Sequence, residues 1–381
     1  MIYEEIENEL KPLLDVVKSA RVKDFPEYEA NMNKCALSIA LDIFKGLGVS
    51  FKKGEPFTLE DIRVKTNYQP QSEYLITRLL SILVEDKVIE PIDNIPGKFI
   101  PINPDLYIES PPELLVRLAK KYPEESASLQ WLARAYNGMI PLVKGSAYPE
   151  DVLFPWGDMG LIQELYDESP IYKYYSILAA KTVDTIIKKI FKKKAALLEV
   201  GAGVGNGTDV LLGLDCKNFE KYLFTDIARS MVRNAKKKYA DYPFMEYGIF
   251  DLSIDPSDQD IDKTSFDIVF AVNVVHAAKN CKTALKNIYD VLKNNGALVI
   301  AEISPPVNSI YRFMEITFGL IPSYNDYEDK DVGPDSPLLT QDKRIGLCKE
   351  IGFESSFALP YSLIDDKEYG NYRGGVIVAF K

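Results

Sequence analysis

Residues 191–381 alternate between two patterns of hydrophobic and polar positions. Short apolar runs have the composition of buried strands: AALLEV, KYLFTDI, FDIVFAV, GALVIAEI and GVIVAFK. Between them lie segments with apolar residues at helical spacing, such as ARSMVRNAKKKY and CKTALKNIYDVLK. Strands that alternate with helices predict an α/β domain with a parallel sheet covered by helices on both faces. The last run follows a Gly-rich turn, so we expect it to join the sheet as an antiparallel strand.

Residues 1–115 carry mostly helical patterns instead. The segment ANMNKCALSIALDIFKGLG predicts a helix that ends at Gly48, and Thr58 and Asp61 have the spacing of a capping box that begins a second helix. A third helical pattern, EYLITRLLSILVEDK, precedes two short strand-like runs, VIEPIDN and KFIPI. Three helices followed by a hairpin are typical of a winged helix. Residues 116–190 are helical and rich in aromatic side chains, which predicts a linker or lid.

Composition and charge narrow the classes of function. The 381 residues contain 45 Lys and Arg against 56 Asp and Glu, which gives a formal charge of −11 and disfavours a nucleic-acid-binding protein. The third predicted helix carries Arg78 beside Glu73, Glu85 and Asp86, and so has no basic face. We therefore expect the winged-helix region to have a structural or dimerising role. The single histidine, His276, excludes any metal site with two histidine ligands.

The sequence also predicts a compartment. No apolar stretch is long enough for a transmembrane helix, and the acidic N-terminus lacks the basic and apolar regions of a secretory signal. The four cysteines lie far apart, without the paired spacing of a disulfide scaffold or a zinc site: Cys35, Cys216, Cys281 and Cys348. We therefore expect a reduced, cytoplasmic protein without a membrane segment.

A glycine-rich segment follows the first predicted strand of the α/β region. Glu199 lies two residues before Gly201, the first glycine of the sequence Gly201-Ala-Gly203-Val-Gly205. Tight glycine turns after a first strand let a ligand approach the backbone at the carboxyl edge of a sheet. Asn206 occupies the position where the dinucleotide fingerprint requires a glycine. The acidic residue followed by G-x-G-x-G instead resembles the binding loop of the S-adenosylmethionine-dependent methyltransferases.

Acidic residues after the next two strands strengthen that resemblance. Asp226 ends the second strand, 25 residues after the first glycine (226 − 201), where a carboxylate can accept hydrogen bonds from both ribose hydroxyls. A helix N-cap is the alternative role for this residue. Asp251 and Leu252 follow a third possible strand, EYGIF, where the resemblance implies that an acid and apolar side chains meet the adenine. It adds Ile227 and Asn273 to the expected cofactor-binding residues.

The single histidine lies at the same predicted edge. His276 follows the strand FDIVFAV, and Glu302 ends the next strand, 26 residues later (302 − 276). The ends of sequential parallel strands are often neighbours, so the two side chains can form a hydrogen bond. A carboxylate beside an imidazole fixes its tautomer and makes it a better general base. The alternative is a histidine that is satisfied within its loop, beside a strand-end acid without a catalytic role.

Several segments resemble the methyltransferase domains of polyketide synthases. Four lie in the α/β region: LEVGAGVGNGT, YLFTDIARSM, AVNVVHAAKNCKTALKNI and ALVIAEIS. Two others, VLFPWGDMGLIQELYDESP and FMEITFGLIPSYNDYED, precede and follow them, so that the likeness covers roughly residues 30–381. In the carbon-methylating members, the histidine of an NVxHAT motif and the glutamate of the following strand form a catalytic dyad, and these positions match His276 and Glu302. The resemblance implies a Rossmann-like class I methyltransferase core with a helical, winged-helix-like lid.

The resemblance also implies a reaction. We expect methylation of the α-carbon of a β-ketoacyl thioester on an acyl carrier protein, with S-adenosylmethionine as methyl donor, S-adenosylhomocysteine as product and no metal ion. Ala278, Ser323 and Tyr324 depart from the residues that the family usually has, and they fall around the acceptor pocket. O-methylation of a β-hydroxyl by the same base, O-methylation of a free small molecule, and a scaffold domain that binds the cofactor without turnover therefore remain open.

Two further expectations concern the acceptor. Four aromatic residues are expected at its pocket: Tyr166, Tyr175, Phe318 and Tyr324. Carrier proteins are typically acidic, so a protein of charge −11 needs a local basic surface to bind one. Two clusters could supply it, although each could equally be a solvated helix face: Arg117 with Lys120 and Lys121, and the run Lys236-Lys237-Lys238.

Overall fold

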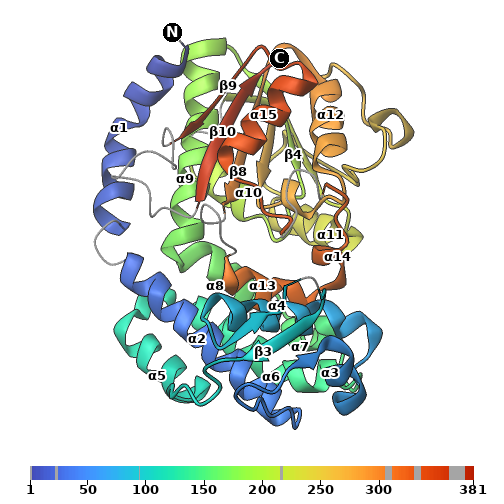
Figure 1. Cartoon of the computed structure of the whole chain (residues 1–381). Helices are drawn as coiled ribbons and strands as arrows, with labels where there is room; N and C mark the ends of the chain where they lie inside the picture. The colour runs from blue at the N-terminus through green and yellow to red at the C-terminus, as the bar shows by residue number, and fades with distance from the viewer. Residues whose placement is uncertain are drawn as a thin grey trace. The chain divides into compact units, whose positions relative to one another are not determined.

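The chain forms two compact units. A computed structural model describes residues 2–21, 25–93, 95–214, 218–304, 311–329, 336–359 and 374–381. The core unit comprises Met1–Phe25, Tyr166–Ser309 and Asp326–Lys381, and the helical unit comprises Pro26–Leu165 and Ile310–Asn325. Figure 1 labels the elements of both units. Each unit therefore combines segments that lie far apart in the sequence.

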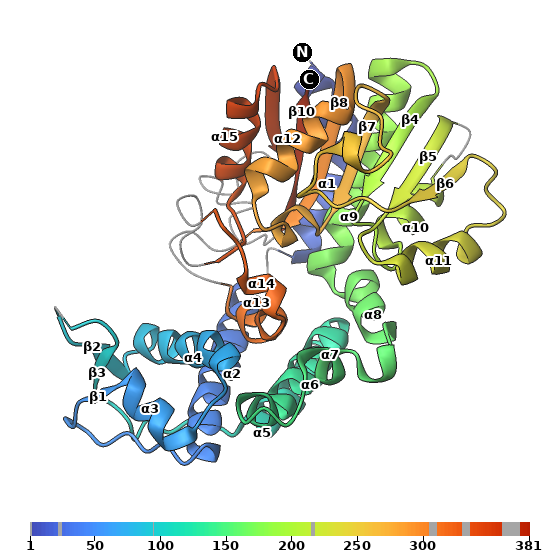
Figure 2. The ribbon, with the colours of Figure 1, turned by 90° about the vertical axis from the view of Figure 1, so that its right-hand side faces the viewer.

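A sheet with seven strands among the described residues forms the centre of the core unit (Figure 2). The strands are β4 (Ala195–Val200), β5 (Phe219–Thr225), β6 (Met245–Gly248), β7 (Phe266–Val272), β8 (Leu292–Ile303), β9 (Ser355–Leu359) and β10 (Gly374–Phe380). Their order is β6-β5-β4-β7-β8-β10-β9. The strands from β4 to β8 pair in parallel, whereas β10 is antiparallel to both of its neighbours. The predicted α/β fold, with its antiparallel last strand, is confirmed.

Helices cover both faces of this sheet. The helices α12 (Cys281–Val291) and α15 (Gln341–Ile351) pack against one face, and α9 (Pro170–Thr185) and α10 (Asn206–Leu212) lie on the other. The helix α1 (Ile2–Arg21) packs on α9, and α11 (Arg229–Lys238) flanks β5 and β6. The five parallel strands are thus enclosed between helical layers, which explains why their sequences are almost continuously apolar.

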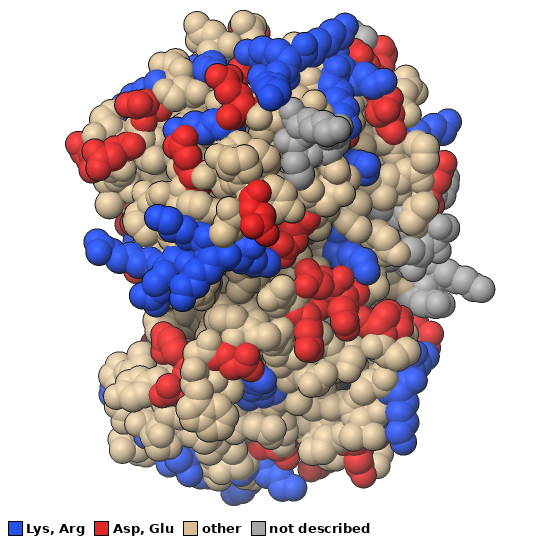
Figure 3. Space-filling view, turned by 180° about the vertical axis from the view of Figure 1, so that it is seen from behind, with Lys and Arg blue, Asp and Glu red and all other residues tan. Residues whose placement is uncertain are grey.

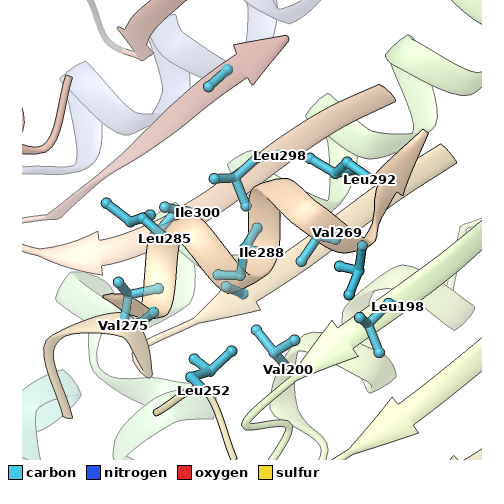
Figure 4. Close-up of a cluster of buried hydrophobic side chains, with 14 of the residues drawn as sticks. Leu198, Val200, Leu252, Val269, Val275, Leu285, Ile288, Leu292, Leu298 and Ile300 are labelled. Carbon is cyan, nitrogen blue, oxygen red and sulfur yellow. The ribbon is translucent and has the colours of Figure 1, made fainter. Parts of the chain in front are cut away.

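Alternation along β4 divides its side chains between the two faces. Leu198 and Val200 join a buried cluster with Ile288 of α12, which Figure 4 shows in close-up. Glu199 lies between them in the sequence, so its side chain projects to the opposite face, toward α10. The apolar packing of β4 therefore determines which face receives the acidic residue of the glycine segment.

The helical unit follows the predicted order of three helices and a hairpin. The helices α2 (Phe25–Gly46), α3 (Leu59–Thr66) and α4 (Glu73–Glu85) precede the antiparallel strands β2 (Ile89–Pro91) and β3 (Lys98–Pro101). A two-residue strand that we did not predict, β1 (Phe57–Thr58), pairs with the other side of β3. The remaining helices are α5 (Pro111–Lys121), α6 (Ser126–Val143), α7 (Pro149–Leu153), α13 (Arg312–Ile316) and α14 (Pro322–Asn325), with α8 (Gly160–Glu168) at the sequence boundary between the units. None of the described helices has both the length and the apolar composition that crossing a membrane requires.

Thr58 begins α3 as the sequence predicted. The N–H of Asp61 donates to Oγ1 of Thr58 at 3.1 Å, and the N–H of Thr58 donates to Oδ2 of Asp61 at 2.7 Å. This reciprocal pair satisfies N–H groups that the first helical turn would otherwise leave without partners.

The described cysteines are buried thiols. Cys35, Cys281 and Cys348 are free, and burial raises the pKa of each to about 12. They therefore stay protonated at neutral pH and act as small apolar side chains. Cys216 lies outside the described residues.

The observed units differ from the division that the sequence suggested at three places. The helix α9, expected in the linker 116–190, belongs to the core unit, because Tyr175 and Leu178 are fully buried and the helix packs against β8 and β10. Residues 1–25 also belong to the core unit, through the packing of α1 on α9. Residues 310–325, expected in the core, belong to the helical unit. Contacts between distant segments leave no periodic signal in either segment, so the sequence could not reveal these exchanges.

A buried carboxylate fastens the segment around α13 to the rest of the helical unit. Glu315 of α13 is fully buried and accepts hydrogen bonds from the hydroxyls of Tyr74 at 2.6 Å and Tyr324 at 3.1 Å. Nε of Arg78, from α4, lies 3.2 Å from Oε2 of the same carboxylate. A buried charge is tolerated only when partners replace its lost hydration, so Glu315 depends on these three side chains.

Replacing Arg78 by Met should therefore destabilise the helical unit by about 3–5 kcal/mol, because Glu315 would remain buried without its cation. The chain's two tryptophans, Trp131 and Trp156, both belong to this unit, so urea denaturation followed by tryptophan fluorescence reports its unfolding. Arg63, which forms an exposed ion pair on α3, provides the control, and Arg63→Met should leave the midpoint nearly unchanged. An equal loss of stability in Arg78→Met and Arg63→Met would contradict a special role for the buried pair of Arg78 and Glu315.

Candidate active site

A glycine turn follows β4 at the carboxyl edge of the sheet. Gly201 and Gly205 have φ values of 56° and 87°. A Cβ at Gly201 would lie 2.0 Å from Cγ2 of Val274, and one at Gly205 would lie 2.0 Å from the hydroxyl of Tyr239, so conformation and packing both require glycine. At Gly203, by contrast, the nearest atom to an added Cβ is a backbone oxygen 4.0 Å away. This side of the turn is open to a ligand.

Glu199 stabilises the elements on either side of the glycine turn. Its side chain is buried, and Oε2 accepts hydrogen bonds from the hydroxyls of Thr208 at 2.5 Å and Tyr222 at 2.6 Å. A Cβ at Gly207 would lie 2.7 Å from its Oε1. Burial raises the pKa of Glu199 to about 7, although the two hydroxyls act in the opposite direction. The carboxyl group thus ties α10 and β5 to β4, and a contact between Glu199 and a cofactor stays a prediction.

Asp226 joins the glycine turn to the end of β5. Its Oδ2 accepts a hydrogen bond from the N–H of Gly203 at 2.9 Å, and its Oδ1 accepts one from the N–H of Ala228 at 2.7 Å. A carboxylate has about four lone-pair positions, so both oxygens keep capacity for further donors. Ile227, directly beside it, is 64% exposed and offers an apolar surface at the same edge.

Asp251 and Leu252 follow β6, as predicted. Oδ1 of Asp251 accepts hydrogen bonds from the N–H and the hydroxyl of Ser253. The side chain of Leu252 is 7% exposed and belongs to the cluster beneath α12, and its contact with a cofactor stays a prediction. Oδ2 of Asp251 and the N–H of Leu252 have no hydrogen-bond partner among the described residues, and these are the groups that a ligand could use.

His276 and Glu302 lie side by side at the ends of β7 and β8. Nδ1 of the imidazole forms a hydrogen bond with Oε2 of Glu302, while Oε1 accepts the N–H groups of Val274 at 3.0 Å and Val275 at 2.7 Å. Glu302 is 1% exposed. Burial alone would raise the pKa of Glu302, but His276, Arg344 and the N–H of Val275 outweigh it and keep that pKa below its ordinary value. Glu302 is therefore an ionised carboxylate that binds several groups at once. Nε2 is the ring nitrogen of His276 that has no hydrogen-bond partner among the described residues.

Arg344 is a residue of this site that the sequence analysis missed. It lies on α15, is 1% exposed, and places Nη2 3.6 Å from Oε2 of Glu302. The guanidinium also donates to the carbonyl of Ile303 at 2.9 Å and to the hydroxyl of Ser304 at 3.3 Å. Its positive charge offsets the cost of burying the carboxylate. Its segment, QDKRIGLCKEI, has the composition of an ordinary surface helix, so no sequence signal identified it.

A tyrosine from α9 orients Asn273, the first residue after β7. The hydroxyl of Tyr175 donates to Oδ1 of Asn273 at 2.6 Å, and burial raises the pKa of Tyr175 far above its usual value, so the hydroxyl keeps its proton. Nδ2 of Asn273 is buried and has no partner among the described residues. A buried N–H group without an acceptor is costly, which marks this amide as a donor for a bound molecule. Gly374 makes room for the ring of Tyr175, because a Cβ there would lie 2.0 Å from it.

The other aromatic residues expected at the acceptor pocket are divided between the two units. Tyr166 belongs to the core unit and packs edge-on against Tyr172, with 5.2 Å between ring centroids. Phe318 belongs to the helical unit, where it packs on Trp131 at 5.4 Å. Tyr324 donates to the buried carboxylate of α13 in the same unit. Each has a structural partner within its own unit, and a contact with the acceptor stays a prediction.

Comparison with known proteins shows which proteins this chain resembles. A family model described as a methyltransferase domain matches residues 198–298, from β4 into β8. The crystal structure of the CurJ carbon methyltransferase is 26% identical with a TM-score of 0.88, and the alignment covers 99% of this chain and 98% of that chain. The chain is an S-adenosylmethionine-dependent methyltransferase. The matched stretch contains the glycine turn, Asp226, Asp251 and His276.

Two further comparisons place the methyltransferase among related proteins. It shares its fold with the trans-methyltransferase CalH, solved in complex with S-adenosylhomocysteine, at 22% identity and a TM-score of 0.66 over 94% of this chain and 92% of CalH. It is 33% identical over 229 residues to the polyketide synthase PksR of Bacillus subtilis (strain 168). That alignment covers 58% of this chain but 9% of PksR, so the methyltransferase spans less than a tenth of the length of this relative.

Glu199→Gln should change how the stability of the methyltransferase depends on pH. Burial raises the folded-state pKa of Glu199 to about 7 from 4.5, so the folded protein binds the extra proton between these values. The resulting stabilisation is complete below pH 4.5 and is lost as the pH rises to about 7, with a magnitude on the order of 3 kcal/mol. Glutamine keeps the acceptor oxygen for Thr208 and Tyr222 but does not titrate.

Urea denaturation followed by circular dichroism, at several values between pH 4.5 and 7, tests this expectation. The unaltered methyltransferase should lose stability relative to the Glu199→Gln variant across this range. Parallel curves for the two proteins would show that Glu199 is already ionised at the lower pH.

Proposed function

We propose that this methyltransferase methylates the α-carbon of a β-ketoacyl thioester carried by an acyl carrier protein, with His276 as the general base. The proposal rests mainly on one observation. A buried, ionised Glu302 binds Nδ1 of the only histidine and leaves Nε2 free at the carboxyl edge that also carries the glycine turn. A base with a fixed tautomer beside a methyl-donor site suits an acceptor that must lose a proton.

The groups at this edge fit S-adenosylmethionine. The open side of the turn at Gly203 accommodates the methionine part of the cofactor, and the spare capacity of Asp226 suits the two ribose hydroxyls. The exposed side chain of Ile227 gives the adenine ring an apolar surface. Oδ2 of Asp251 and the N–H of Leu252 are an acceptor and a donor for the adenine edge. When bound, the cofactor would supply an electrophilic methyl group, whose bond to the sulfonium sulfur would break with its electron pair remaining on sulfur.

His276 removes the proton that the acceptor must lose. Because Nδ1 donates its hydrogen to Glu302, Nε2 carries a lone pair that takes a proton from the α-carbon. The C–H electron pair becomes the enolate and then the new carbon–carbon bond to the methyl group. Glu302 acts through His276 as a positioning residue, since its carboxylate holds the tautomer and stabilises the positive charge of the protonated ring. The proton leaves His276 for water after the transfer.

Asn273 is the proposed donor to the enolate oxygen. Its unpaired Nδ2 is buried at the end of β7, three residues before the base. The hydrogen bond from Tyr175 occupies Oδ1 and so keeps the amide turned with its donor available. Donors that are fixed before the reaction stabilise developing negative charge without the cost of reorganisation.

Methylation at carbon is favoured over methylation at oxygen by the similarity to a carbon methyltransferase along nearly the whole chain. The similarity to PksR and other polyketide synthases supports an acceptor that is bound to a carrier protein. The same base could deprotonate a β-hydroxyl, so the experiment below includes that acceptor.

His276→Ala should lower kcat about 10²–10⁴-fold, the usual contribution of a general base. Methyl transfer is measured by mass spectrometry of β-ketoacyl and β-hydroxyacyl carrier proteins incubated with S-adenosylmethionine. The unaltered enzyme should add one methyl group to the β-ketoacyl substrate, and the variant should bind the cofactor as tightly as before. Methylation of the β-hydroxyacyl substrate instead would contradict the carbon acceptor, and undiminished turnover by the variant would contradict the base.

Glu302→Gln tests the positioning role separately. The amide oxygen of glutamine can still accept the N–H groups of Val274 and Val275, but its NH₂ group would donate to Nδ1 of His276. The ring would then carry its hydrogen on Nε2, the nitrogen that must act as base. We expect a loss comparable to that of His276→Ala. Added imidazole should partly restore His276→Ala but not Glu302→Gln, because only the first variant leaves space for a free base. Equal rescue of both would contradict the tautomer argument.

Tyr175→Phe should lower kcat about fivefold, which corresponds to the loss of one hydrogen bond of about 1 kcal/mol. Asn273 would no longer be held with its donor available, whereas the packing of the ring beside Gly374 would be kept. Isothermal titration with S-adenosylmethionine should give an unchanged Kd. A weaker Kd with unchanged kcat would instead assign Asn273 to the cofactor.

A further inference from the structure

The helix α11 presents a strongly basic face. Its sequence, RSMVRNAKKK, contains two arginines and three lysines and no acidic residue, although the chain carries a formal charge of −11. Arg229, Arg233, Lys236 and Lys237 are exposed at positions i, i+4, i+7 and i+8, which place them on one side of the helix. Figure 3 shows the blue side chains gathered over this element. Among the described residues, no ion pair involves any of these four.

The other basic cluster that the sequence suggested is largely neutralised. On α5, Arg117 pairs with Glu109 at 2.9 Å and Lys121 pairs with Glu27 at 2.5 Å. A groove of about 640 Å³ lies along this helix and is lined by three basic residues. Of these three, Lys120 alone forms no ion pair with the described residues. Charges that already have partners attract a further acidic surface weakly. The comparison therefore favours α11.

The position of α11 connects its basic face to the methyl-donor site. It begins three residues after Asp226, and at its other end Nζ of Lys238 lies 3.3 Å from the carbonyl of Val204 in the glycine turn. The same amino group pairs with Asp209 of α10 at 2.5 Å, and the hydroxyl of Tyr239 donates to the carbonyl of Gly205 at 3.1 Å. Both ends of α11 are thus fixed beside the carboxyl edge of the sheet, in the same unit as His276.

We infer that the basic face of α11, formed by Arg229, Arg233, Lys236 and Lys237, is the docking surface for the acidic carrier protein that bears the acceptor. This inference rests on the proposed function. Charge complementarity is its main support, because these cations contribute no ion pair to the fold of the described residues and border the edge where methyl transfer takes place. Surface charges of this kind raise the rate of encounter and select the partner more than they add buried contact.

Reversing two of these charges tests the docking surface. The test variant is Arg233→Glu/Lys237→Glu, and the control variant is Lys192→Glu/Lys194→Glu. Both change the net charge by the same amount. The control residues are exposed and precede β4, so they lie at the opposite end of this strand from the glycine turn. The acceptors are an acetoacetyl-loaded acyl carrier protein and the small thioester acetoacetyl-N-acetylcysteamine. For the carrier-bound acceptor, kcat/KM of the α11 variant should fall about tenfold, or about 1.4 kcal/mol, relative to the unaltered enzyme. Most of this difference in kcat/KM should vanish at an ionic strength of about 1 M. Turnover of the small thioester and of the control variant should be unchanged.

Direct binding separates this inference from the proposed function. The dissociation constant of the loaded carrier protein, measured by fluorescence anisotropy, should rise about tenfold for the α11 variant and stay unchanged for the control. That shift supports the docking surface even if neither acceptor is methylated, an outcome that would overturn the proposed reaction alone. Equal effects in both variants, equal effects on both acceptors, or no effect on the carrier would overturn the surface. Tighter binding of a single-stranded RNA oligonucleotide than of the carrier would also overturn it.

Discussion

The carboxylate of Glu302 is the interaction on which the arrangement of the core edge depends. One oxygen receives two N–H groups from the turn after β7, the other binds the imidazole, and a buried guanidinium lies beside it. Burying an ionised carboxylate is costly, so each of these partners offsets the loss of hydration that folding imposes on Glu302. The turn after β7, the position of His276 and the packing of α15 are thus linked through one side chain. This linkage explains how the single histidine is held at a fixed place.

A second carboxylate performs the corresponding structural task for the methyl-donor side. Asp226 links the glycine turn after β4 to the start of α11, and Glu199 links β4 to α10 and β5 from the buried face. Because β4 is the neighbour of both β5 and β7, the two halves of the site are joined through the sheet itself. The glycine turn also touches the histidine loop directly, since Gly201 leaves space only for Val274. The shape of the glycine turn and the position of the loop that carries His276 are therefore linked.

Much of this arrangement could be predicted from the sequence, because the signals were local or had a fixed spacing. The strand and helix periods predicted the parallel sheet, and the glycine spacing predicted the turn. The spacing of one strand-helix-strand step predicted that Glu302 lies beside His276. The predictions failed where a contact joins segments that are distant in the sequence. Arg344 has no periodic or compositional signal, and the segment around α13 belongs to the helical unit, where its Glu315 is part of a buried hydrogen-bond network. Such placements depend on which charge is buried beside which, and a linear pattern does not encode that.

The cost of burying charge also separates the cations of the interior from those of the surface. Buried acids need positive partners: Arg344 lies beside Glu302, and Arg78 lies beside Glu315. These cations are fixed by the requirements of folding, since removing any of them would leave a carboxylate without compensation. The cations on α11 meet no such requirement, and in a chain of charge −11 an unpaired row of them is not expected from composition alone. A basic surface that folding does not require is consistent with the proposed association, because its positive charge complements an acidic partner.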